Sequence, residues 1–116
     1  MQRVSFQLRI RPELVDEYVA RHTPVWPEML AEIAAAGRRN YSLFLGEAGT
    51  LYGYYETEDD EAAQAYLAQS EIAARWEAEM APFFADLEGR PDQAATLLTE
   101  VFNLEDQLAA SGAAKR

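Results

Sequence analysis

The chain has 116 residues, of which 49% are hydrophobic, and a mean hydropathy of −0.30. This length favours one domain with a single core, and the absence of cysteine excludes a disulfide scaffold and thiolate metal sites. The formal net charge of −10 disfavours nucleic-acid binding. The sequence has no apolar run long enough to form a membrane-spanning helix, so we expect no membrane partner. Because the chain starts without a recognisable secretion signal, we expect a cytoplasmic protein.

The first segment, residues 4–11, alternates strictly between apolar and polar side chains. Such alternation is typical of a strand with one buried face, here formed by Val4, Phe6, Leu8 and Ile10.

A helical pattern follows from Glu13 to His22. Pro24 and Pro27 each remove a backbone donor, so they predict a break near residues 22–26 and then a second helix. Gly37 is a plausible cap at the end of that helix.

Residues 40–46 and 51–57 are rich in Tyr, Phe and Leu, which predicts two strands joined by a hairpin loop at 46–49. A helical region begins after residues 57–60, with an interruption near Gln69 and Ser70 and a second break at Pro82. Residues 97–104 predict a last strand. We therefore expect a domain over 1–104 and a tail over 105–116, either frayed or forming an appended helix.

The predicted order of elements is strand, helix, strand, strand, helix, strand. This order is typical of the ferredoxin-like split βαβ arrangement, an α+β fold with helices on one face of an antiparallel sheet. The other face of such a sheet is commonly buried by a second protomer or left open as a ligand cavity. The sequence therefore predicts some association or binding at that face.

His22 is the only histidine, and its side chain is the one best suited to proton transfer near neutrality. Tyr18 lies one helical turn earlier, so both side chains project to the same side. Aromatic rings beside a polar group are also how proteins bind sugars. Each residue has a plainer interpretation: a lone histidine is usually a satisfied residue at the core's edge, Tyr18 a core tyrosine, and Trp76 more often core than binding platform.

The sequence lacks several motifs that are typical of metal-dependent, phosphoryl-transfer and acyl-transfer enzymes. It has no glycine-rich phosphate loop and no nucleophile elbow around a serine, and one histidine without cysteine does not form a common zinc or copper site. These absences favour cofactor-free proton transfer over redox, phosphoryl or acyl transfer.

The run from Glu17 to Glu28, EYVARHTPVWPE, resembles the signature of the L-rhamnose mutarotase family, which reads broadly E-Y-x-x-R-H-x-x-x-W-P-E. Asn40-Tyr41-Ser42 is similar to a second block, Arg75-Trp76 with Met80 to a third, and Glu100-Val101-Phe102 to the closing strand. The resemblance covers residues 1 to about 104. It implies a dimeric α+β barrel, no cofactor, and interconversion of the α and β anomers of L-rhamnopyranose.

Carried over position by position, the resemblance makes His22 the general acid and Tyr18, Tyr41 and Trp76 the residues that contact the sugar. One position departs from the pattern: the family commonly has a second tryptophan where this chain has Glu77. A carboxylate there does not stack on a sugar, but it accepts hydroxyl hydrogen bonds or acts as a base. The open alternatives are another aldose as substrate, a cofactor-independent monooxygenase-like dimer, and a ligand-binding protein without catalysis.

Overall fold

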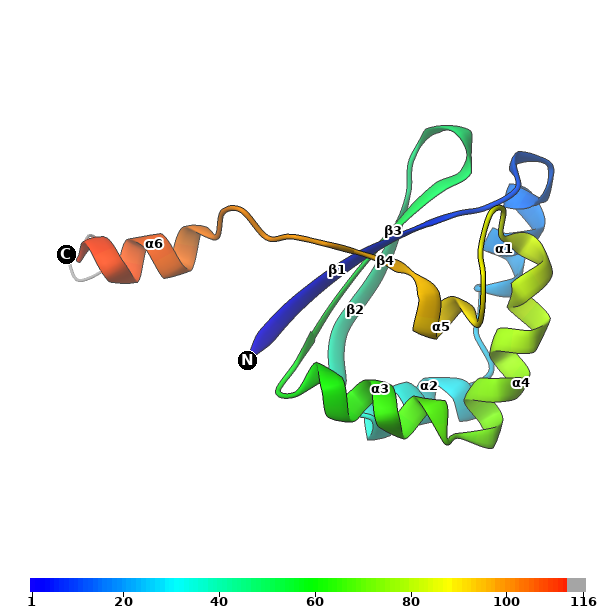
Figure 1. The fold of residues 1–116 in the computed structure, drawn as a ribbon, viewed down its shortest axis with the longest axis horizontal. Coiled ribbons are helices and arrows are strands. Elements are labelled where there is room, and N and C mark those ends of the chain that lie inside the picture. Colours follow the sequence, from blue (N-terminus) through cyan, green and yellow to red (C-terminus); the bar gives the residue numbers. More distant parts are fainter. Residues whose placement is uncertain (113–116) are drawn as a thin grey trace.

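The computed structural model describes residues 1–112, so positions 113–116 of the predicted tail lie outside the described residues. Four strands form one antiparallel sheet in the order β2-β3-β1-β4 (Figure 1). The strands are β1 (Gln2–Arg9), β2 (Arg38–Leu45), β3 (Thr50–Thr57) and β4 (Thr96–Leu98). This strand order, with helices after β1 and β3, confirms the predicted ferredoxin-like α+β class.

The helical segment that follows β1 is interrupted where Pro24 and Pro27 led us to expect a break. A 3₁₀ turn, η1 (Pro12–Leu14), leads into α1 (Val15–Arg21), and α2 (Pro27–Ala35) starts at the second of those prolines. His22 is therefore the residue that ends α1, with backbone that has left the helical conformation. Gly37 follows α2 with φ of +96°, a conformation that favours glycine, as the sequence predicted.

The helical segment that follows β3 consists of α3 (Asp60–Ala68) and α4 (Glu71–Met80), followed by the 3₁₀ turn η3 (Ala81–Phe83). The interruption predicted near residues 69–70 is confirmed. Ser70 caps α4 by accepting a 3.1 Å hydrogen bond from the backbone N–H of Ala73. A third 3₁₀ turn, η2 (Glu47–Gly49), makes the hairpin loop between β2 and β3.

The alternation of β1 orients the whole sheet. Phe6 and Ile10 are 8% and 0% exposed, and their face of the sheet is the one that the helices cover (Figure 1). Gly53 lies directly opposite Phe6 on β3, where a Cβ would come within 2.1 Å of the Phe6 ring. The glycine thus leaves room for an aromatic ring on the inner face. The buried hydrophobic cluster between the sheet and the helices is Ile10, Tyr18, Met29, Leu51, Leu67, Ala73, Trp76, Met80, Phe83 and Phe84.

The last predicted strand is wrong in extent: β4 covers only Thr96–Leu98, whereas the sequence predicted 97–104. Pairing with β1 ends at Ser5, which lies opposite Leu98, and residues 99–103 then leave the sheet edge as an unpaired arm. The arm leads to α6 (Leu104–Ser111), which extends away from the sheet (Figure 1) but is joined to β1 by the ion pair of Arg3 with Asp106. Strand-forming residues without a neighbouring strand have nothing to pair with, and composition does not reveal this.

A short helix, α5 (Pro91–Ala94), precedes β4 and lies near α3 and α4. Within residues 1–112 there is no helix with the length and hydrophobicity needed to cross a bilayer.

Candidate active site

A cavity of about 150 Å³ lies between the inner face of the sheet and the helices α1, α4 and α5. Its volume corresponds to space for on the order of ten water molecules, which suits one monosaccharide. All five residues singled out from the sequence line it: Tyr18, His22, Tyr41, Trp76 and Glu77. The fold therefore brings together residues from α1, β2 and α4, although their roles remain predictions.

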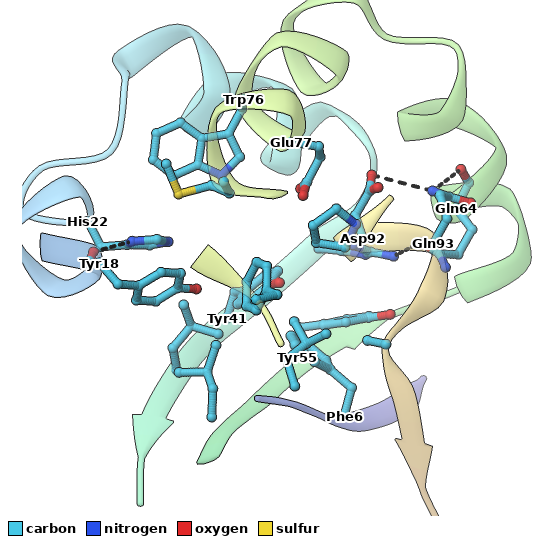
Figure 2. A pocket seen from close by; sticks show the side chains of 18 of the residues that line it. Phe6, Tyr18, His22, Tyr41, Tyr55, Gln64, Trp76, Glu77, Asp92 and Gln93 are labelled. Carbon is cyan, nitrogen blue, oxygen red and sulfur yellow. Dashed lines mark hydrogen bonds between the residues drawn. The ribbon is translucent and has the colours of Figure 1, made fainter. Parts of the chain in front are cut away.

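His22 is half-buried at the end of α1, and its ring points into the cavity (Figure 2). Its Nδ1 lies 2.8 Å from the carbonyl oxygen of Tyr18. A carbonyl oxygen only accepts hydrogen bonds, so Nδ1 carries a proton and Nε2 of the neutral ring is the free proton acceptor. Burial lowers the pKa of His22 below its ordinary value of 6.5, and the hydrogen bond to Tyr18 partly opposes this change.

Trp76 holds the histidine ring from the α4 side. The two rings meet edge to face with centroids 5.2 Å apart, and Trp26 packs against Trp76 in the same way at 5.0 Å. Because Trp76 is only 6% exposed, it serves the core and the cavity at once. Both sequence interpretations of this residue, core tryptophan and cavity wall, therefore hold for its position.

Tyr18 packs against the other side of His22, with ring centroids 4.1 Å apart, and its hydroxyl is directed toward the cavity (Figure 2). Burial is also the main reason why the pKa of its hydroxyl is raised, so the phenol stays neutral and can donate a hydrogen bond. Tyr41 lies beyond it, 5.2 Å from Tyr55 and 6.1 Å from Phe6 between ring centroids. These rings make one wall of the cavity aromatic.

Glu77 follows Trp76 on α4 and points its carboxyl group into the same space (Figure 2). The residue is 8% exposed. Burial, reinforced by the nearby carboxylate of Asp92, raises the pKa of Glu77 to about 8. A carboxyl group in this position is mostly protonated at neutral pH, so it donates a hydrogen bond rather than acting as an anion.

Polar residues that the sequence did not single out close the far end of the cavity. Arg38 donates to Asp60 at 3.3 Å and to Gln64 at 2.7 Å, and its guanidinium lies 4.1 Å from the centre of the Tyr55 ring. Asp92 at this end comes from α5. No sequence period predicts that α5 lies beside the cavity. Tyr55 is on the same buried face of β3 as Leu51, two pairs of residues apart along the strand.

The groups that line this aromatic pocket are suited to proton transfer. They include a neutral imidazole, a neutral carboxyl group and tyrosine hydroxyls. In the part of the chain that the structure describes, residues 1–112, no group of three His, Asp or Glu side chains is arranged to hold a metal ion.

Comparison with known proteins agrees with the signature in the sequence. A family model described as L-rhamnose mutarotase matches residues 3–104. The L-rhamnose mutarotase of Oceanobacillus iheyensis is 37% identical over 106 residues, which cover 90% of this chain and 100% of the relative. The protein of the same name from Listeria monocytogenes is 38% identical over 107 residues, with 90% and 99% covered.

Solved structures give the same result. The crystal structure of L-rhamnose mutarotase from Formosa agariphila superposes with a TM-score of 0.73 at 27% identity, covering 90% of this chain and 99% of that one. An antibiotic biosynthesis monooxygenase superposes with a TM-score of 0.57 over 88% of this chain and 100% of its own, but at 19% identity it shares the fold alone. With the family model matching residues 3–104, the chain belongs to the L-rhamnose mutarotase family.

Proposed function

We propose that this protein interconverts the α and β anomers of L-rhamnopyranose, and that His22 exchanges protons with the sugar. The observation that carries the proposal is a family member whose only histidine, already fixed in tautomer by Tyr18, points into a cavity of monosaccharide size. The reaction is an isomerisation that leaves the composition of the sugar unchanged.

Mutarotation requires two proton transfers. One group protonates the ring oxygen while another removes the proton of the anomeric hydroxyl, so that the C1–O5 bond opens. The open aldehyde rotates about C1–C2 and closes again on its other face. Because closing retraces opening, a residue that accepts a proton in the first half donates it in the second, and His22 serves as general acid in one of the two halves.

The aromatic residues supply binding and orientation. Tyr18 and Tyr41 present hydroxyl groups and ring edges to the sugar, and Trp76 fixes the His22 ring against the apolar side of the substrate. L-rhamnose is a 6-deoxy sugar, so its C6 is a methyl group, which suits a pocket lined by Leu8 and Phe6.

Exchange NMR tests the proposal by following magnetisation between the α and β anomeric protons of equilibrated L-rhamnose. Wild-type protein should accelerate the exchange, and His22→Ala should lower the enzyme-dependent rate by roughly 10²- to 10⁴-fold. His22→Ala protein that folds normally and keeps the full rate would refute the role of His22. No acceleration by the wild-type protein would refute L-rhamnose as the substrate.

We also infer that the protein works as a homodimer in the cytoplasm. The cysteine-free sequence suits a reducing compartment. The dimer is supported by the outer face of the sheet, where the register aligns Phe44 with Tyr52 and Tyr54 with Ser5 and Leu98. Phe44, Tyr52 and Leu98 on this face are 62%, 40% and 40% exposed. A face with so much exposed apolar surface is typical of an interface.

A further inference from the structure

Glu77 is a buried acid for which residues 1–112 supply no ion pair. Its carboxyl group points into the cavity from α4, while the His22 ring enters from the end of α1 (Figure 2). None of the ion pairs found among residues 1–112 includes Glu77. Burial and the Asp92 carboxylate raise the pKa of Glu77, and they outweigh the charge of Arg90, the backbone N–H of Asp92 and the charge of Arg38, each of which lowers it.

The cations near Glu77 are engaged elsewhere. Arg90 holds both carboxylate oxygens of Asp92, with Nε–Oδ1 at 2.7 Å and Nη2–Oδ2 at 2.6 Å. Arg38 is directed to Asp60 and Gln64. Of the two neighbouring acids, Asp92 has a bidentate ion pair with Arg90, whereas Glu77 has no ion pair within residues 1–112. Burial therefore favours the protonated form of Glu77.

Resting on the proposed function, we propose that neutral Glu77 is the general acid that protonates the ring oxygen of the sugar, while neutral His22 accepts the proton of the anomeric hydroxyl at Nε2. The position of Glu77 relative to His22, on a different element of the same cavity, allows the two groups to act on the two oxygens attached to C1.

The proton transfers balance over the cycle. During opening, the Glu77 proton moves to O5 as the C1–O5 electron pair leaves with O5, and the electron pair of the anomeric O–H bond becomes the second bond of the aldehyde. The intermediate state holds a Glu77 carboxylate, a His22 imidazolium and an open-chain sugar. During closing, imidazolium returns its proton to the aldehyde oxygen, and the carboxylate takes the proton of the C5 hydroxyl as O5 attacks C1.

The ionisation of both groups agrees with these starting states. Burial is the largest contribution for each: it raises the pKa of Glu77 to about 8 and lowers the pKa of His22 below 6.5. Near neutrality the acid therefore carries its proton and the imidazole does not. The titratable and charged groups that face Glu77 from the surrounding elements are Tyr18, Arg38, Tyr41, Arg90 and Asp92.

The test is the pH profile of the anomer-exchange rate at sub-saturating L-rhamnose, which reports the free enzyme. The wild-type rate should fall above pH of about 8, as Glu77 loses its proton. It should also fall below the lowered pKa of His22, as the imidazole becomes protonated. Glu77→Gln should lower the rate by roughly 10²- to 10⁴-fold and abolish the upper limb.

Glu71→Gln is the matched control, because it makes the same substitution at an exposed position of the same helix and should keep the rate and both limbs. A second measurement follows the side-chain carboxyl carbon of Glu77 by ¹³C NMR, assigned by its absence in Glu77→Gln. Titration near 8 is expected. Titration in the ordinary glutamate range, or a Glu77→Gln protein with full rate and an intact upper limb, overturns the inference while the proposed function stands. No exchange by the wild-type protein overturns both.

Discussion

At the scale of single residues, the site depends on what surrounds His22. Tyr18 provides its backbone carbonyl to Nδ1 of the ring, at 2.8 Å, and its own ring to the imidazole face. Trp76 closes the other side. A solvent-exposed histidine samples both tautomers, whereas the contact with the Tyr18 carbonyl favours the tautomer that leaves Nε2 as the proton acceptor. The helix break that the prolines impose after residue 22 is what leaves the ring at an open end.

The Tyr18 hydroxyl can be tested separately from the Tyr18 ring. Tyr18→Phe keeps the ring contact with His22 and removes one hydrogen-bonding group from the cavity. The loss of one hydrogen bond to the sugar weakens binding by about 0.5–1.5 kcal/mol. We expect the exchange rate at sub-saturating sugar to fall roughly 2- to 10-fold, mainly through a higher KM. Tyr66→Phe is the control, because its hydroxyl bonds Glu32 on the protein surface. Equal rates for both variants would contradict a role of the Tyr18 hydroxyl in binding.

The sequence predicted this half of the site well and the other half poorly. Tyr18 and His22 follow from helical spacing, because neighbours one turn apart share a face, and Trp76 follows from the resemblance to the family. Arg38, Gln64 and Asp92 come from the start of β2, from α3 and from the four-residue α5, and they meet only in the folded chain. The ionisation of Glu77 depends on that meeting, so no local pattern predicts it.

At the scale of elements, α4 carries both Trp76 and Glu77 and is anchored at its first turn. Ser70 accepts from the backbone N–H of Ala73 at 3.1 Å and donates to the carboxylate of Glu32 on α2. Ser70 is 8% exposed, and its bond with the backbone N–H of Ala73 is buried. This one side chain caps α4 and ties it to the neighbouring helix.

Ser70→Ala should therefore lower the free energy of unfolding by about 1–2 kcal/mol, since it removes the cap and leaves the buried backbone N–H of Ala73 without that partner. Asn103→Ala is the matched control: it removes the cap of α6, where Asn103 accepts from Asp106 at 2.9 Å, but α6 has no buried residue. Fraying of α6 is local, so that variant should stay within about 0.5 kcal/mol of the wild type. Urea unfolding measures both. A similar loss in the two variants would contradict the account.

The element boundaries show where local patterns suffice. The break after α1 and the cap between α3 and α4 follow from prolines and a serine, which act on the backbone next to them. The extent of β4 does not, because a strand exists only where another strand pairs with it. Past Leu98 the chain keeps strand-forming residues but leaves the edge of β1. The predicted strand over 97–104 fails for that reason.

At the scale of the whole molecule, the chain is more extended than a closed domain of its length. Its radius of gyration is 15.9 Å, against about 13 Å for a compact chain of this size. The excess comes from the arm and α6, which project from the sheet edge (Figure 1). Val101 and Phe102 on the arm are 90% and 61% exposed. Large apolar side chains in such a position are costly in water unless another surface covers them.

The outer face of the sheet and the arm adjoin, so one partner copy can cover both, and each copy of a twofold dimer would then use the same surface. We expect light scattering at micromolar concentration to give twice the chain mass. Phe44→Lys should shift the protein from dimer to monomer, because it places a charge on the apolar outer face, where Phe44 pairs with Tyr52. Leu30→Lys is the control, since Leu30 is 51% exposed on α2, away from that face. A monomeric wild type, or a Phe44→Lys protein that remains dimeric, would show that this face is not the interface.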